Sequence, residues 1–193
     1  MKLELKIVDF LASDGGEFTI NELAKRIDEY YSFVYRTVNR MAKDGVIAKK
    51  KAGKAYMCSL KLTNEKSNAL LKLAEIEKKE ELYARSKHLK IILDDFIALI
   101  EKRNILSAVL FGSYSKGTQT KDSDIDILLL VKGSINIEKS VREIYAKYGK
   151  ELSVVEMTVN EFKKQVGKPL IKEIKKNHHV IYNVEKFVGE AFE

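Results

Sequence analysis

The chain has 193 residues, of which 45% are apolar and 33% charged, and its 35 basic against 28 acidic residues give a formal net charge of +7. A single cysteine, Cys58, excludes an intrachain disulfide, and no apolar run approaches the roughly 20 residues that a membrane-spanning helix needs. The first residues lack the apolar core and cleavage site of a signal peptide. We therefore expect a cytoplasmic chain of two small domains with no membrane partner, and a basic excess that favours phosphate-rich partners.

The first part of the chain predicts three helices. An apolar period typical of a helix runs through Leu3–Leu11. Thr19 and Glu22 have the spacing of a capping box, which predicts that a second helix starts there. Ser32 is expected to cap a third helix, and Gly45 stands where a helix commonly ends.

A basic hairpin is predicted next, because VIAKKKAGKAYMCSLKLT reads as two strands around a lysine-rich turn with Gly53 at its tip. Three helices followed by such a hairpin are the order of a winged helix, and residues 1–62 resemble the helix-turn-helix and wing of the MarR and ArsR groups of regulators. The resemblance implies double-stranded DNA as a partner. The candidate DNA contacts are Tyr31, Ser32, Tyr35, Arg36, Asn39 and Arg40 on the third helix, and Lys49, Lys50, Lys51 and Lys54 on the wing. The alternatives are a solvated surface and a winged helix that binds protein.

Residues 63–103 are predicted to be a helical linker, since no Gly or Pro occurs between positions 64 and 103. We expect a break near Lys78–Glu81. An apolar stripe follows one helical face: Leu82, Leu89, Leu93, Phe96 and Ile100. Such a stripe usually packs on its own domain, and the alternative is the seam of a homodimer.

Residues 104–193 alternate between strand and helix patterns, which indicates an α/β layer with a mixed sheet within a chain that is α+β overall. The predicted strands are Ala108–Phe111, Asp124–Val131, Glu151–Thr158 and Val180–Tyr182. The predicted helices cover residues 137–148, 160–165 and 170–177, with Thr158 as the cap of the second.

The stretch LFGSYSKGTQTKDSDIDILLLV carries the chemistry of the sequence. Gly112 and Ser113 follow a strand and open a helical turn, and a glycine allows the backbone to approach a ligand closely. The amide groups at a helix start, the Ser113 hydroxyl and the nearby Lys116 suit phosphate oxygens. Gly112, Ser113 and Lys116 are therefore the candidate nucleotide-binding residues.

Asp124 and Asp126 follow at the start of the next strand. Side chains two apart on a strand share one face, roughly 7 Å apart along the backbone. Two carboxylates there can hold Mg²⁺ or Mn²⁺, and such ions can clamp the attacking and leaving oxygens of a phosphoryl-type transfer. Asp124 and Asp126 are the predicted metal ligands and catalytic residues.

Gly-Ser, a spacer of ten residues and Asp-Ile-Asp together resemble the nucleotidyltransferase superfamily of DNA polymerase beta and the aminoglycoside nucleotidyltransferases. The compact size is similar to the minimal nucleotidyltransferases of prokaryotes, and the resemblance covers residues 104–183. It implies that Ser113 holds a nucleoside triphosphate and that Asp124 and Asp126 hold magnesium.

Catalytic members of that family carry a third carboxylate on a neighbouring strand. Ser153 occupies the matching position here. Glu151 shares its face by the alternation of a strand, whereas Glu156 lies on the opposite face. Glu151 and Glu156 are the candidates for the third acid, and without one the acceptor hydroxyl lacks its general base.

Two functions remain open on this basis. The first is an enzyme that transfers a nucleoside monophosphate from a nucleoside triphosphate to a hydroxyl acceptor and releases pyrophosphate. The second is a DNA-binding regulator or antitoxin, in which the nucleotidyltransferase-like domain senses a nucleotide or binds a partner protein without turnover. The two are compatible if modification regulates DNA binding.

Overall fold

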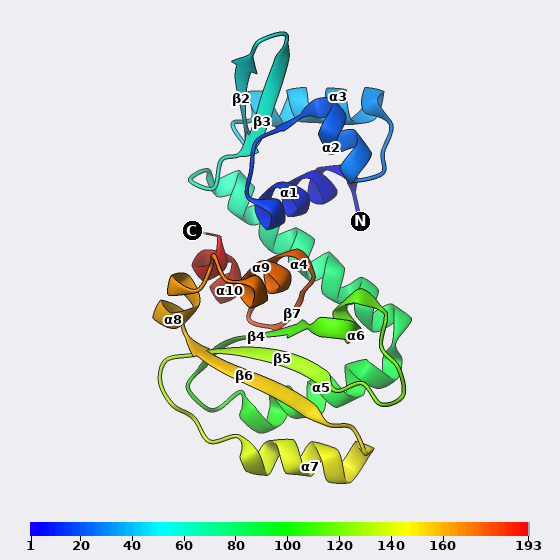
Figure 1. The fold of residues 1–193 in the computed structure, drawn as a ribbon, viewed down its shortest axis with the longest axis vertical. Helices are drawn as coiled ribbons and strands as arrows, with labels where there is room; N and C mark the ends of the chain where they lie inside the picture. Colours follow the sequence, from blue (N-terminus) through cyan, green and yellow to red (C-terminus); the bar gives the residue numbers. More distant parts are fainter. Residues whose placement is uncertain (193) are drawn as a thin grey trace. The chain divides into compact units, whose positions relative to one another are not determined.

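The computed structural model describes residues 1–192. These residues form two compact units, and the boundary between the units falls within the long helix α4 (Glu65–Arg85). Unit 1 comprises Met1–Glu77 and Phe192, and unit 2 comprises Lys78–Ala191. Figure 1 shows the elements of each unit. Among the described residues, no helix is both long enough and apolar enough to span a membrane.

Unit 1 holds three helices, a three-stranded antiparallel sheet and the first part of α4. The elements are α1 (Leu3–Asp14), β1 (Phe18–Thr19), α2 (Ile20–Arg26), α3 (Tyr31–Lys43), β2 (Ile47–Ala52), β3 (Ala55–Leu60) and α4 (Glu65–Arg85). The sheet order is β1-β3-β2. Its core contains Leu5, Leu23, Val38 and Cys58, all fully buried, and burial raises the pKa of the Cys58 thiol.

Local sequence signals account for most of these boundaries. Thr19 caps α2, and its capping box with Glu22 is complete, as predicted. The expected cap at Ser32 is wrong. Helix α3 begins at Tyr31, and its N-cap is Tyr30, two residues before the expected cap. Ser32 lies inside the first turn, where its carbonyl accepts a hydrogen bond from Arg36 Nε at 3.3 Å.

The predicted break near Lys78–Glu81 is also wrong, because α4 runs unbroken from Glu65 to Arg85. The sequence Lys-Lys-Glu-Glu consists of good helix formers and contains nothing that stops a helix. The chain turns instead at Ser86, whose extended backbone ends α4 and whose hydroxyl accepts from Leu89 N at 3.4 Å to cap the next helix.

Unit 2 is built on a four-stranded mixed sheet with strand order β6-β5-β4-β7. Strands β5 and β6 are parallel, and the other pairs are antiparallel. After α4 the elements are α5 (Lys87–Ile100), β4 (Ile105–Phe111), α6 (Gly112–Lys116), β5 (Ile125–Val131), α7 (Glu138–Tyr148), β6 (Leu152–Thr158), α8 (Val159–Lys164), α9 (Pro169–Lys176), β7 (His179–Tyr182) and α10 (Val184–Ala191). The sequence pattern did not predict α10.

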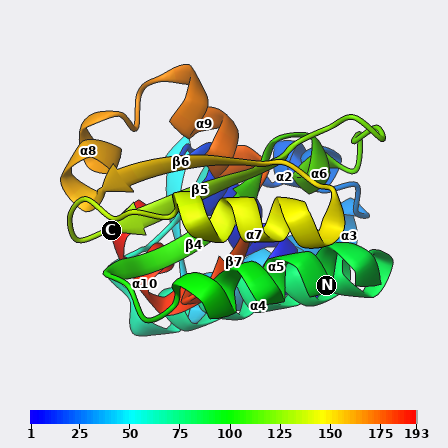
Figure 2. The ribbon, with the colours of Figure 1, turned by 90° about the horizontal axis from the view of Figure 1, so that it is seen from below.

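Helices cover both faces of this sheet (Figures 1 and 2). Helices α5 and α7 lie on one face, where Leu89, Leu93, Phe96 and Ile100 join Leu82 in the core. The apolar stripe of this segment is thus packed within its own unit, as expected, so these residues do not form a dimer seam. Helices α8 and α10 contact the sheet on the other face, where Phe162 and Phe187 are fully buried.

Candidate active site

The turn after β4 is shaped by Gly112. Its φ of +72° lies in the left-handed region, and a Cβ placed there would stand 2.0 Å from Asp126 Oδ2. The glycine is therefore required on two grounds, the backbone conformation and the space that the Asp126 carboxylate occupies. We predicted that this glycine lets a ligand approach the backbone closely. Part of the space beside it is occupied by the Asp126 carboxylate.

Asp126 sits on the central strand β5, with Phe111 of β4 opposite on one side and Ser153 of β6 opposite on the other. Its side chain is half-buried, whereas Asp124 precedes the strand and is exposed. Burial raises the pKa of Asp126, the negative charge of Asp124 raises it further, and a hydrogen bond with Ser153 lowers it. The site thus favours a cation beside Asp126, because a positive charge would relieve the burial of the carboxylate.

Ser153 lies directly opposite Asp126, at the position where the resemblance to the nucleotidyltransferases leads us to expect a third acid. Glu151 lies just before β6 and its carbonyl accepts from Ile125 N at 2.9 Å. Glu151 lines a hollow together with three residues of α7: Val141, Arg142 and Tyr145. Glu156 is exposed and lies opposite Leu129, so it does not share the face of Asp126.

Within residues 1–192, no group of three or more His, Cys, Asp and Glu side chains is arranged to hold a metal ion. Two carboxylates still fit Mg²⁺, because that ion usually keeps several waters and is bound through one or two carboxylates together with substrate phosphates. Asp124 and Asp126 are the residues that would hold it. His178 and His179 are not placed as ligands either. Both are buried, and the centroid of the His178 ring lies 5.0 Å from that of the Phe187 ring.

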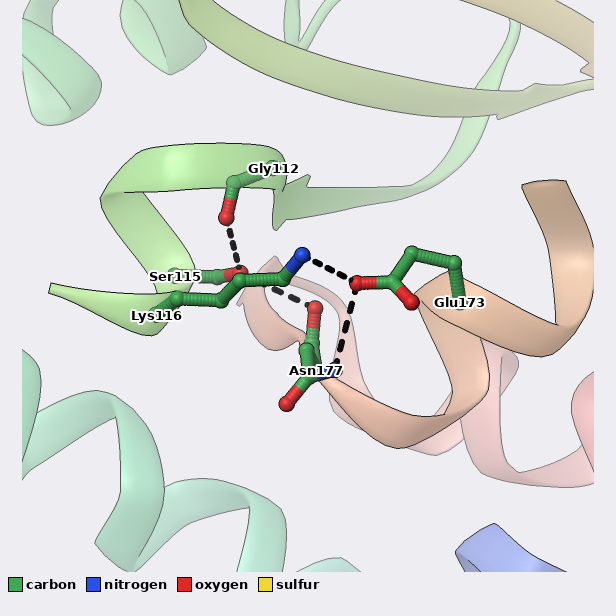
Figure 3. A network of polar contacts seen from close by, with 5 residues as sticks. All are labelled: Gly112, Ser115, Lys116, Glu173 and Asn177. Carbon is green, nitrogen blue, oxygen red and sulfur yellow. Dashed lines mark hydrogen bonds and ion pairs between the residues drawn. The ribbon is translucent and has the colours of Figure 1, made fainter. Parts of the chain in front are cut away.

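Lys116, expected at the phosphates, forms an ion pair with Glu173 of α9, with 2.5 Å between Nζ and Oε1 (Figure 3). The hydrogen bond from Lys116 lowers the pKa of Glu173. Asn177 Nδ2 donates to the same carboxylate at 3.2 Å. Sequence reasoning missed this contact, because nothing in the spacing of residues 116 and 173 links them.

Ser115 ties the same two elements together. Its hydroxyl lies 2.9 Å from the Gly112 carbonyl and 3.0 Å from the Asn177 carbonyl (Figure 3). The end of α9 is therefore fixed to α6, directly beneath the turn that carries Gly112 and Ser113. Ser113 is half-buried in α6, and its carbonyl accepts from Thr118 N at 3.0 Å.

The residues predicted to contact DNA lie on α3 and on the β2–β3 hairpin. Several already have partners within unit 1. Arg40 forms an ion pair with Glu4, and Lys49 Nζ donates to Asn39 Oδ1 at 2.6 Å. Arg36 lies over the Phe33 ring, 5.1 Å from its centroid. Tyr31, Ser32, Tyr35, Lys50, Lys51 and Lys54 are exposed.

In a comparison with known proteins, residues 95–187 match the family model described as polymerase beta, nucleotidyltransferase. A relative from Methanocaldococcus jannaschii, provisionally named a protein adenylyltransferase, is 30% identical over 112 residues, which cover 52% of this chain and 76% of the relative.

Two solved structures show weaker likeness. A toxin–antitoxin structure with AMP-PNP has a TM-score of 0.37 at 19% identity and covers 51% of this chain and 82% of its own. The archaeal chromatin protein TrmBL2, described with a novel mode of DNA binding, has a TM-score of 0.29 at 18% identity and covers 89% of this chain and 68% of its own. Neither is close enough to establish a shared fold. On the family match and the relative, this chain belongs to the polymerase beta nucleotidyltransferase family.

Proposed function

We propose that unit 2 binds a nucleoside triphosphate with Mg²⁺ or Mn²⁺ and transfers the nucleoside monophosphate to a hydroxyl group. The observation that carries this proposal is the Asp126 carboxylate, half-buried on the central strand and packed against Gly112. Such a carboxylate is poised for a cation, and the adjacent turn with Ser113 offers polar groups to phosphate oxygens.

The roles of the chain's residues follow from this arrangement. Asp124 and Asp126 hold the metal, which when bound neutralises the charge of the triphosphate. Gly112 and Ser113 orient the triphosphate, so that the acceptor oxygen attacks the α-phosphorus and pyrophosphate leaves. The name of the Methanocaldococcus relative favours a protein hydroxyl as the acceptor.

The transfer is expected to be slow. Ser153 is neutral and has no useful basicity near pH 7, so it cannot take the proton of the acceptor hydroxyl. Glu151 lies two residues before Ser153, about 6.6 Å further along the strand, and lines a hollow with residues of α7, so we do not expect it to bind the same metal ion as Asp126. We therefore expect nucleotide binding with weak or absent turnover.

The experiment combines binding and turnover. The full chain is incubated with labelled nucleoside triphosphates and Mg²⁺, with and without protein acceptors, and its melting temperature is measured in the same conditions. Mg²⁺ and triphosphate should raise the melting temperature through binding to the folded state. Asp126→Asn should remove most of that rise, whereas Asp122→Asn, in the exposed loop before the motif, should keep it. An equal rise in both variants would refute the assignment of the metal site.

A second candidate function concerns residues 1–62, which we propose act as a winged helix that binds double-stranded DNA. The observation that favours it is the exposed polar side of α3 beside a hairpin that carries Lys50 and Lys51 on β2 and Lys54 in its turn. The chain then acts as a regulator or antitoxin, with residues 63–103 as linker and residues 104–193 as a nucleotide sensor or as the surface for a partner protein or a second copy. Binding of the full chain to duplex DNA that weakens steeply with salt tests this function.

A further inference from the structure

Exposed aromatic side chains are concentrated on unit 1. Of the six aromatic side chains that are exposed within residues 1–192, Tyr145 lies on α7 and the other five lie at the start of α3 or on β3. These five are Tyr30, Tyr31, Phe33, Tyr35 and Tyr56, and between 46% and 77% of each is exposed. Single exposed apolar side chains are ordinary, but exposed apolar side chains that gather in one place commonly mark a binding groove.

Three of these rings border one groove. It is lined by Thr19, Ile20, Asn21, Tyr31, Tyr35, Lys54, Ala55 and Tyr56, and has a volume of about 220 Å³. The Tyr31 and Tyr35 rings are 5.9 Å apart and inclined by 30°. The volume is below the roughly 300–1,000 Å³ of usual ligand pockets, so the groove suits a single ring system better than a whole cofactor.

The ring of Tyr56 is held in place by its neighbours. Lys49 Nζ lies 4.6 Å from its centroid, and the same ammonium is anchored by Asn39 at 2.6 Å. Lys51 stands opposite Tyr56 in the β2–β3 ladder. A ring that is fixed before binding loses little conformational entropy when a ligand stacks on it.

The charge around the groove is positive. Lys54 lines it and no carboxylate does, while Lys49 and Lys51 flank Tyr56. Flat aromatic rings interleaved with cations match a nucleobase joined to phosphate, since bases stack on aromatic rings and phosphates attract lysines. In a duplex the faces of the bases are covered by their neighbours and the grooves present the edges, so the rings require a base that is unstacked.

We propose that the groove of Tyr31, Tyr35 and Tyr56 binds an unstacked nucleobase of a single-stranded nucleic acid segment. The inference deepens the second candidate function, nucleic-acid binding by unit 1. It adds a stacking contact to the phosphate contacts of the hairpin, and it predicts that single strands, loops or opened duplexes bind better than closed duplex.

The experiment measures fluorescence anisotropy of the full chain with labelled oligonucleotides in the presence of EDTA, which suppresses metal-dependent nucleotide binding by unit 2. The ligands are oligothymidylate, an abasic oligomer of equal length and charge, a duplex and free thymidine monophosphate. Oligothymidylate should bind about 5- to 150-fold more tightly than the abasic strand, the range expected for stacking of one base. Free monophosphate should compete weakly, and strong competition by it would assign the groove to a free nucleotide and overturn the proposal.

The variants assign the effect to the groove. Tyr35→Leu and Tyr56→Leu should abolish the difference between the base-bearing and abasic strands, Tyr35→Phe should retain it, and Tyr145→Leu on α7 should leave it unchanged. Equal binding of the two strands by the wild-type chain overturns the inference without any variant. A difference between base-bearing and abasic strands that persists in both Leu variants overturns the inference. Duplex binding retained in those variants leaves the second candidate function standing, whereas no binding of any oligonucleotide overturns both.

Discussion

The fold holds the two candidate sites in different ways. One is the carboxylate pair of unit 2, Asp124 and Asp126, and the other is the basic face of unit 1, which consists of the candidate DNA contacts on α3 and on the β2–β3 hairpin. Asp126 lies on a central strand whose apolar residues, Ile125, Ile127 and Leu129, are fully buried. The candidate DNA contacts lie on α3 and on a two-stranded hairpin, where Lys50, Lys51 and Lys54 are exposed. One site is thus fixed by the core of its unit, and the other is formed largely by exposed side chains.

This difference determines what a single substitution should do. A change at the carboxylate site alters packing, and therefore affects stability and binding together. A change on the basic face alters charge at an exposed position, where stability effects are usually within about 0.5 kcal/mol.

The largest effect is expected at Gly112. Alanine there is strained by the left-handed backbone, which costs about 1–2 kcal/mol, and its Cβ would collide with Asp126 Oδ2, which adds about 1–3 kcal/mol. We expect Gly112→Ala to lower the free energy of unfolding by about 2–5 kcal/mol in urea titrations and to remove the stabilisation by Mg²⁺ and triphosphate.

Gly117→Ala is the matched control, because Gly117 has nearly the same φ of +71° and nothing within 4 Å of the added Cβ. It should lose about 1–2 kcal/mol from backbone strain alone and retain nucleotide binding. Equal losses in the two variants would show that the contact between Gly112 and Asp126 does not matter.

The second prediction adds the missing acid. Ser153→Asp places a like charge opposite Asp126, so without metal the variant should be less stable by up to about 1 kcal/mol. With Mg²⁺ the sign reverses, because a third carboxylate strengthens cation binding. A tenfold gain in affinity would add about 1.4 kcal/mol of stability at saturation.

Thermal unfolding of the Ser153→Asp variant at increasing Mg²⁺ concentration measures this gain, and labelled triphosphate tests whether transfer appears. Ser153→Asn has nearly the same shape without the charge and should respond to Mg²⁺ as the wild type does. If both variants respond alike, the strand face opposite Asp126 is not part of the metal site.

Much of unit 2 was predictable from its sequence, because buried strands and capped helices leave local patterns. The run Ile125–Val131 is nearly all apolar, and Thr158 caps α8 with Glu161 as the sequence suggests. The family resemblance led us to expect Ser153 at the position opposite Asp126, and the register of β5 and β6 places it there. Strand alternation by itself separates only the two faces of the sheet. Helix α10 was missed although Val184, Phe187, Val188 and Ala191 recur at helical spacing, because its 8 residues repeat that pattern over only about two turns.

Contacts between distant residues could not be predicted in this way. Lys116 and Glu173 are brought together by the packing of α6 against α9, and Arg40 meets Glu4 across α1 and α3. No local pattern encodes such pairs. The sequence therefore identifies which side chains are chemically suited to a site, whereas tertiary packing decides which of them are already engaged.

The third prediction addresses the basic face. Arg36→Ala should reduce the preference of the full chain for a duplex selected from a random pool, by a discrimination of about 1–3 kcal/mol. Lys51→Ala should weaken all duplexes alike and lower the salt slope by about 1. Anisotropy titrations at several salt concentrations separate the two effects. Identical behaviour of both variants would indicate a surface that attracts DNA by charge without reading its sequence.

The smallest effect is expected at the ion pair of Lys116 and Glu173. Both side chains are about 40% exposed, and pairs of this kind contribute about 0–1 kcal/mol. Lys116 can reach a phosphate only by leaving Glu173, so Glu173→Gln should raise the affinity for Mg²⁺ and triphosphate by about 2- to 5-fold, and less at high salt. Calorimetric titration measures the change, and the same substitution in a Lys116→Ala background should have no effect. Glu190→Gln, which breaks the comparable Lys163–Glu190 pair at 3.0 Å, controls for the loss of a surface charge in the same unit. A fall in affinity on Glu173→Gln would mean that Glu173 holds Lys116 in its binding position, and would reverse the role proposed for the pair.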